Sequence, residues 1–171
     1  MEMLDIIKNR VSVRSFQSGK QVPEETLIKI LEAGRMAPSA ANRQPWHFYM
    51  ISDKDKLSVI SGSYQAAWFK NAPHVLVVVG NREKAWKRGR DGYNAIETDL
   101  TIAMDHMILT ADSLGIGTCW IAAFDPEILY TTMELDESEV IYAITPLGYP
   151  EDHFIPRKKD RKDPKEVYTL L

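Results

Sequence analysis

The sequence has little of the chemistry that enzymes build from their own side chains. Cys119 is the only cysteine, so an intrachain disulfide is excluded, and its apolar neighbours predict a buried structural thiol rather than a nucleophile. The four histidines show no HxxxH spacing and the cysteine has no CxxC partner, so no metal site is predicted. A GxSxG motif and a phosphate-binding P-loop are also absent. An enzyme with this sequence would depend on a bound cofactor for its reaction.

Long apolar runs and a strong excess of one charge are missing as well. The run HVLVVVG at 74–80 is far shorter than the roughly 20 apolar residues that a membrane helix needs. The first residues, MEMLDIIKNR, carry acids where a signal peptide has a basic region and an apolar core. With 21 basic and 24 acidic residues the net charge is -3, which disfavours a general nucleic-acid binder. We therefore expect a cytoplasmic protein with no membrane or nucleic-acid partner.

What is present is the composition of an ordinary globular protein. Of the 171 residues, 44% are hydrophobic and 26% are charged, which suits one domain spanning 1–171. Apolar residues become scarce after Pro150, so residues 151–171 are predicted to form an extended C-terminal arm. Its last stretch, VYTLL, has strand propensity but no local partner. We expect it to pair with a sheet edge, that of a second copy included.

Helices and strands are predicted from hydrophobic periodicity and from proline and glycine signals. Helices are expected at 3–8, 23–37, 54–61, 64–70, 93–114 and from Asp125 onwards, and strands at 47–52, 75–79, 118–123 and 139–145. The helix at 93–114 is apolar most of the way round, which requires burial in a core or an interface. Residues 82–92 carry five basic residues and two glycines and are predicted to form a mobile loop. Such a loop is either a lid over a substrate or a solvated surface segment.

Arg10, Ser12 and Arg14 alternate with two valines near the N-terminus. In an extended chain this alternation puts both guanidinium groups and the hydroxyl on one face and the valines on the other. A guanidinium fork matches a phosphate, and a charge-assisted hydrogen bond of this kind contributes roughly 1.5–3 kcal/mol. The pattern predicts an anion site, although a solvated edge strand fits these three residues equally well.

A small and polar stretch, PSAANRQPW at 38–46, follows the predicted helix at 23–37. Proline disfavours the helical conformation in the residue before it, so Pro38 is expected to end that helix. The small side chains leave room for a flat ring, while Asn42 and Gln44 supply hydrogen-bond donors and acceptors. The stretch predicts a loop against a planar ligand, or else a turn that packs only on itself.

Taken together, these motifs resemble the nitroreductase family of flavin enzymes. The resemblance begins with RxSxR at 10–14 and PSAxNxQPW at 38–46. It continues in the family's order with LGIGTCWIAAF at 114–124, LGYP at 147–150 and a KxR pair at Lys159 and Arg161, so that it covers nearly the whole chain. It implies an α+β, three-layer sandwich with a central, mostly antiparallel sheet flanked by helices. It also implies a homodimer whose C-terminal arms are exchanged.

The resemblance further implies an FMN site at the dimer interface. Its phosphate contacts correspond to Arg10, Ser12, Lys159 and Arg161. Arg14 would be the catalytic residue, because a cation at the N1/O2 edge of the ring stabilises the charge that reduction brings. The other implied contacts are Pro38, Ser39, Ala40 and Asn42 from the partner subunit, the side chain of Gln65, and the backbone of Ala122 and Ala123. The sequence departs from the family near Ala122 and Ala123, where glycine is more usual, and at about Trp68, where some relatives carry a lysine.

The activity that the resemblance implies is a ping-pong oxidoreduction. NADH or NADPH would reduce FMN by hydride transfer and leave, and a nitroaromatic, a quinone or a similar acceptor would then take the electrons. Three alternatives stay open: a flavin store or sensor without turnover, a basic surface on the arm and on residues 82–90 for an anionic partner, and a relative that fragments flavin or removes halogen from aromatic substrates. The sequence does not distinguish NADH from NADPH.

Overall fold

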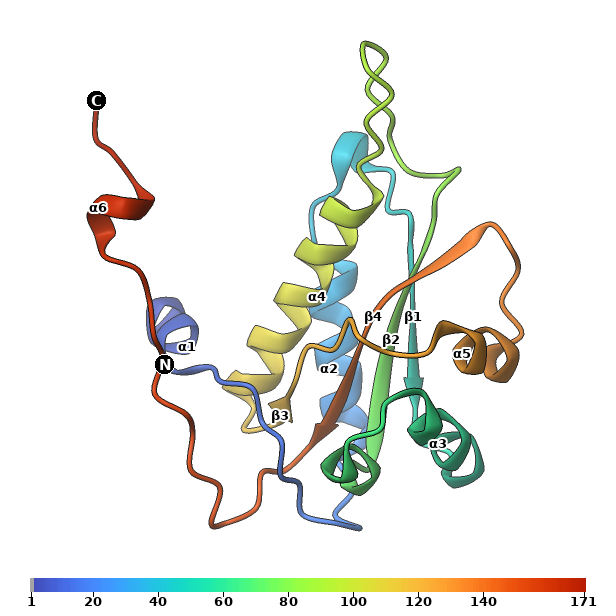
Figure 1. Cartoon of the computed structure of the whole chain (residues 1–171), viewed down its shortest axis with the longest axis vertical. Coiled ribbons are helices and arrows are strands. Elements are labelled where there is room, and N and C mark those ends of the chain that lie inside the picture. Colours follow the sequence, from blue (N-terminus) through green and yellow to red (C-terminus); the bar gives the residue numbers. More distant parts are fainter. Residues whose placement is uncertain (1) are drawn as a thin grey trace.

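The computed structural model describes residues 2–171, which fold around an antiparallel sheet (Figure 1). Within these residues the sheet has four strands in the order β1 (Trp46–Ile51), β2 (His74–Asn81), β4 (Glu139–Gly148) and β3 (Gly117–Thr118). The two central strands pair from His74 with Leu147 to Asn81 with Glu139. Residues 74–80 of β2 are all buried, so both faces of the sheet must be covered.

One face of the sheet is covered by α2 (Glu24–Arg35) and α4 (Ile96–Ser113). Ile30, Met104 and Met107 pack there against side chains from β2 and β4. The two helices approach closely at Gly34, where an added Cβ would lie 2.7 Å from the sulfur of Met107. The long apolar helix predicted at 93–114 therefore exists, and much of its surface is buried in the core.

The other face is covered by α3 (Lys54–Ile60), α5 (Pro126–Met133) and the 3-10 turns η2 (Ser61–Ser63) and η3 (Ala67–Asn71). Ile60, Phe69 and Leu129 pack there against β2 and β4. Asp125 caps α5 by accepting a hydrogen bond from the backbone of Glu127, and Pro126 follows at the first helical position, as the sequence predicts. The result is the predicted α+β arrangement of helix, sheet and helix layers.

The chain ends run outside these layers. α1 (Met3–Asn9) lies beside the C-terminal arm, which Figure 1 shows as an extended segment away from the sheet. The ammonium of Lys159 ties the two together by donating a 3.0 Å hydrogen bond to the carbonyl of Ile7. Towards its end the arm forms one helical turn, α6 (Pro164–Val167).

Three predicted elements differ in the structure. The strand expected at 118–123 is limited to β3 and one bridge between Ile121 and Ile144, because the N–H of Cys119 bonds to the hydroxyl of Thr145 instead of to a strand backbone. The helix expected at 64–70 is the shorter turn η3. The strand predicted for VYTLL at 167–171 is wrong at its first residue. Val167 ends the helical turn α6, whose start is fixed by a capping box between Asp163 and Glu166. Residues 168–171 are exposed.

His74 gives the fold a dependence on pH. Its ring is 2% exposed, and its Nε2 accepts the N–H of Val22 at 3.0 Å while its Nδ1 lies 2.6 Å from the hydroxyl of Ser52. Burial lowers the pKa of His74. In the unfolded chain this histidine therefore binds a proton near pH 6.5, whereas in the folded chain it binds one only at a lower pH. Stability from this group is complete above about pH 6.5 and falls as the pH drops below it.

We expect the free energy of unfolding to fall by about 1 kcal/mol more in the wild type than in His74→Gln between pH 7.5 and 5.5. Urea unfolding at several pH values measures the difference between the two slopes. His47→Gln, which removes an exposed histidine from β1, controls for the loss of an imidazole. Equal slopes for wild type and His74→Gln would contradict this account.

Candidate cofactor-binding site

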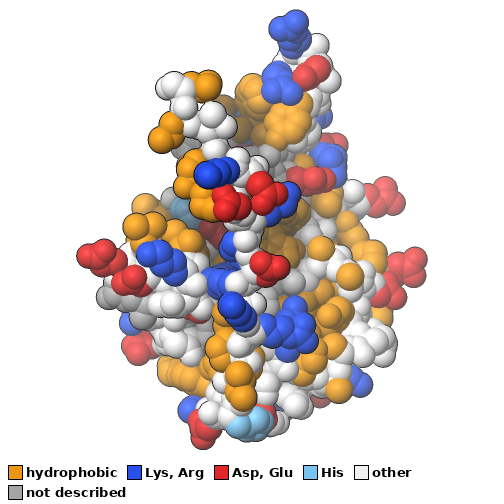
Figure 2. Space-filling model, turned by 60° about the vertical axis from the view of Figure 1, so that its left-hand side comes forward, with side chains coloured by type: hydrophobic (Ala, Val, Ile, Leu, Met, Phe, Trp, Pro, Cys, Tyr) orange, Lys and Arg blue, Asp and Glu red, His pale blue; other side chains and the backbone are white. Residues whose placement is uncertain are grey.

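Basic side chains from the two ends of the chain line one cavity of about 210 Å³. It is formed by Arg10, Val11, Ser12 and Arg14 on one side and by residues 157–161 of the arm on the other. Figure 2 brings this side of the molecule forward and shows basic side chains gathered along the middle of the face. The structure thus brings together all of the residues predicted to contact a phosphate: Arg10, Ser12, Lys159 and Arg161.

The alternation of the RVSVR segment explains how it presents its polar side chains. Ser12 bridges to Thr118 of β3, and the N–H of Val13 donates to the carbonyl of Thr118 at 2.8 Å. Val13 is buried against Gly117, where an added Cβ would lie 2.8 Å from the valine side chain. Because Val13 is anchored on the sheet, its neighbours Ser12 and Arg14 turn to the opposite face.

The charges around the cavity leave it in need of an anion. The pKa of Lys159 is lowered by burial first, and also by its cationic neighbours Arg10 and Arg161, while Asp112 at the end of α4 raises it. Burial raises the pKa of Asp112, and the nearby Arg10 and Lys159 oppose that rise. Like charges crowded in this way are relieved by a bound anion, so the residues present fit a phosphate group.

Cys119 lies next to this cluster without being a reactive thiol. Burial raises its pKa, and Arg14 and Ser12, which are close enough to interact with the sulfur, only partly offset that effect. The sequence predicts the burial correctly. What it does not predict is the nearby cation, because residues 14 and 119 are far apart in the chain. The thiol stays protonated at neutral pH, in keeping with a structural role.

The other predicted contacts from the same chain lie elsewhere. Ala122 and Ala123 are exposed beyond the Ile121 bridge, and their backbone N–H groups make no hydrogen bond within residues 2–171, so they are free to donate to a ligand. Gln65 does not line the basic cavity, and its side-chain amide donates to the carbonyl of Gly62 at 3.0 Å. Trp68, three residues on, packs against Phe16. Gln65 remains a prediction.

The predicted loop at 38–44 lies at the opposite end of α4. Its backbone forms the 3-10 turn η1 (Ala40–Asn42), and the N–H of Ala40 donates to Asp99 in the first turn of α4. The basic cavity lies near Asp112 in the last turn, thirteen residues or about 20 Å further along the helix. One chain therefore does not bring Pro38, Ser39, Ala40 and Asn42 to the basic cavity.

The segment predicted to be a mobile loop contains a projecting hairpin at residues 86–95 (Figure 1). Lys87 bridges to Asn94, and the guanidinium of Arg88 pairs with Asp91 and lies over the ring of Tyr93. Trp86 is half-buried and lines an apolar cavity of about 240 Å³ together with Tyr93 and the loop that contains Pro38. The structure thus joins this hairpin to the predicted ring-binding loop.

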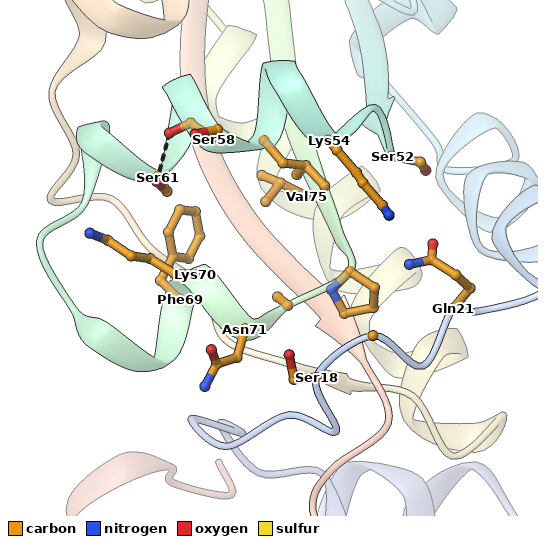
Figure 3. A pocket seen from close by; sticks show the side chains of 14 residues that line it. Ser18, Gln21, Ser52, Lys54, Ser58, Ser61, Phe69, Lys70, Asn71 and Val75 are labelled. Atoms are coloured by element: carbon orange, nitrogen blue, oxygen red, sulfur yellow. Dashed lines mark hydrogen bonds between the residues drawn. The ribbon is translucent and has the colours of Figure 1, made fainter.

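A cavity of about 530 Å³ opens elsewhere, between α3, η3 and the start of β2 (Figure 3). It holds Lys54 and Lys70, but Figure 3 shows their ammonium groups pointing in different directions. None of the predicted site residues lines it. Size alone would select this cavity as the binding site, whereas the convergence of charge selects the smaller one.

Comparison with known proteins decides the family. A family model described as the nitroreductase family matches residues 7–64 and 58–149. The chain belongs to the nitroreductase family. This confirms the family, the fold and the class of enzyme, an oxidoreductase of the nitroreductase type, that the motifs predict.

Individual relatives agree with the family model. A protein from Archaeoglobus fulgidus, provisionally named NADH dehydrogenase/NAD(P)H nitroreductase, is 32% identical over 88% of this chain and 87% of its own length. The crystal structure of a nitroreductase family protein from Clostridium difficile 630 superimposes with a TM-score of 0.90 at 30% identity, covering 99% and 98% of the two chains. An FMN-dependent nitroreductase from Clostridium difficile R20291 gives 0.78 at 26% identity over 98% and 99%.

Asp99 is the main polar residue near this candidate site that the sequence patterns do not predict. It is 1% exposed, and it stands on the apolar stripe of α4 between Ile96 and Ala103. An acid on a stripe that is otherwise apolar was the available signal.

No helix within residues 2–171 is long and apolar enough to cross a membrane, and the described part of the chain holds no cluster of three potential metal ligands.

Proposed function

We propose that this member of the nitroreductase family is an FMN-dependent NAD(P)H oxidoreductase. The observation that carries the proposal is the convergence of Arg10, Ser12, Lys159 and Arg161 on one basic cavity. Two sequence segments separated by most of the chain provide these residues. The relative named as FMN-dependent and the relatives named for NAD(P)H support the choice of cofactor and donor.

The chain's own residues divide the work at this site. Three arginines and one lysine, at 10, 14, 161 and 159, supply charge for the phosphate end and for one ring edge. The free N–H groups of Ala122 and Ala123 supply donors to another edge. When bound, FMN supplies hydride transfer between NAD(P)H and an oxidised acceptor. Arg14 is exposed beside the residues proposed to bind the phosphate. It would place a positive charge where reduction of the flavin brings negative charge.

The proposed working form is a homodimer with a site shared by two copies. Residues 38–42 lie about 20 Å along α4 from the basic cavity in the same chain, so only a second copy can bring them to it. The exposed end of the arm, at residues 168–171, is free to reach that copy. The donor and then an acceptor such as a nitroaromatic or a quinone would use the same slot in turn, which gives ping-pong kinetics.

The first test is an anaerobic absorbance spectrum of the purified protein with FMN, recorded before and after NADH and then NADPH. We expect a bound-flavin spectrum that bleaches with one nicotinamide at least, and that returns when a quinone is added. Flavin that binds but stays oxidised with both donors would point to a store or sensor instead. Failure to bind supplied FMN would contradict the assignment of the basic cavity.

A further inference from the structure

The loop at 38–44 has an unfavourable backbone conformation. Ala41, Asn42 and Gln44 have φ values of 50°, 52° and 48°, in the left-handed region that disfavours residues other than glycine. Outside this loop, the described chain has one other such residue, Glu134 at the end of α5. Strain gathered in one loop persists only where the surroundings hold it in place.

Asp99, which lies outside this loop, accepts a hydrogen bond from it. Its Oδ1 accepts the N–H of Ala40 at 2.9 Å, and Asp99 itself is fixed in the first turn of the 18-residue helix α4. Several other hydrogen bonds stay within the loop, such as the 2.9 Å bond from the N–H of Gln44 to the hydroxyl of Ser39. Within residues 2–171, Asp99 gives the only hydrogen bond that connects residues 38–44 to α4.

Burying this acid is unfavourable by itself. Asp99 is 1% exposed, and its Oδ2 has no hydrogen-bond partner within the described chain. A buried carboxyl group with one oxygen unpaired destabilises a fold, and an apolar residue would suit the stripe of α4 better. Asp99 also borders the apolar cavity that Trp86, Tyr93 and Pro38 line. What the acid provides at this place is the bond to Ala40.

We propose that Asp99 is a positioning residue for the flavin. Through Ala40 it keeps residues 38–42 in the conformation, left-handed at Ala41 and Asn42, that lies against the FMN bound by the partner subunit. This inference rests on the proposed function, because the loop's contact with FMN is part of it. Asp99 does not touch the flavin; it raises the fraction of molecules whose loop is ready to bind.

The test compares Asp99→Ala with Asp99→Asn in the full-length chain. Alanine removes the acceptor for Ala40, whereas asparagine keeps one side-chain oxygen for it and replaces only the unpaired one. We expect FMN to bind about 10- to 100-fold more weakly to Asp99→Ala, the effect of losing the hydrogen bond to Ala40, and within about threefold of wild type to Asp99→Asn. Quenching of FMN fluorescence measures the affinity, and far-ultraviolet circular dichroism of the apoprotein checks the fold.

Two further variants separate positioning from general stability. Glu97→Ala removes the other acid of the first turn of α4, which is exposed, and should bind FMN as the wild type does. Adding Ala41→Gly to Asp99→Ala should recover part of the lost affinity, because glycine adopts a left-handed conformation freely. Because glycine at residue 41 can also stabilise the fold as a whole, the free energy of unfolding is measured by urea for each variant: recovery of FMN affinity beyond any recovery of stability supports positioning.

The outcomes are distinct. Undiminished FMN affinity in Asp99→Ala, or an equal loss in Asp99→Ala and Asp99→Asn, would overturn the positioning role while the proposed function stood. A wild-type protein that binds no FMN would overturn the proposed function, and this inference with it. Loss in Asp99→Ala with rescue by Asp99→Asn would support it.

Discussion

Replacing Arg10 and Lys159 together by alanine is expected to weaken FMN binding by roughly a hundredfold to ten thousandfold. Each side chain supplies a charged donor to the phosphate site, and a hydrogen bond of this kind contributes about 1.5–3 kcal/mol. Both residues line the same cavity; burial and then the charge of Arg10 lower the pKa of Lys159, and the charges of Arg10 and Lys159 oppose the rise in the pKa of Asp112. Because they share a ligand, the two single effects need not add. A double-mutant cycle with FMN fluorescence measures their coupling.

The matched control for this variant lies on the same arm. Lys162→Ala with Lys165→Ala removes the same charge from exposed positions that do not line the cavity, and its FMN affinity should stay near that of wild type. Lys159 also bonds to carbonyls at the end of α1, so its loss can loosen the arm. Arg10→Ala alone avoids this complication. If the double variant binds FMN within threefold of wild type, the phosphate does not bind at this cavity.

Replacing Arg14 by alanine is expected to retain FMN but to lower turnover by about 100- to 1,000-fold. The phosphate residues at 10, 12, 159 and 161 remain in this variant, so the cofactor should still bind. What is lost is the cation proposed to face the ring edge where negative charge develops, and removing one such group typically has an effect of this size. Arg14 is exposed, so the fold should be preserved.

The reductive half-reaction provides the measurement for Arg14. Mixing the FMN-loaded protein with NADH or NADPH in an anaerobic stopped-flow instrument gives the rate of flavin bleaching directly. Arg14→Lys keeps the charge but lacks the planar fork, so it should fall between the wild type and Arg14→Ala. Turnover that is unchanged in Arg14→Ala would remove the role given to this residue.

Much of the fold could be predicted because its signals are local. The alternation around Ser12, the apolar periodicity of α4 and the Asp125-Pro126 pair each specify structure through neighbours a few residues away. The errors arose where a local signal was overlooked or where a distant group intervened. Asp163 and Glu166 were available to predict the helical turn at α6. By contrast, no local signal indicates that the hydroxyl of Thr145 accepts the N–H of Cys119, the hydrogen bond that shortens β3.

The candidate site also combines residues that a local pattern predicts with residues that only the folded chain brings together. The alternation at residues 10–14 predicted an anion site, with a solvated edge strand as an equal alternative, and the family resemblance added Lys159 and Arg161. The structure brings these residues to one cavity, and their contact with a phosphate stays a prediction. Asp99 was missed because its meaning depends on Ala40, which lies 59 residues earlier in the chain. Trp86 and Pro38 likewise lie far apart in the chain, and the hairpin brings them to one cavity.

By itself, the sequence determined the family, the order of most elements and the identity of the basic residues, since each of these depends on residue type and short-range spacing. The tertiary structure decided which of those residues meet. Pairing of Ser12 with Thr118 of β3 and the hydrogen bond from Lys159 to the end of α1 bring Lys159 to Arg10, while the length of α4 keeps the loop at 38–44 away from them. Such distances result from the burial of the whole core, to which every layer contributes, and no short segment encodes them.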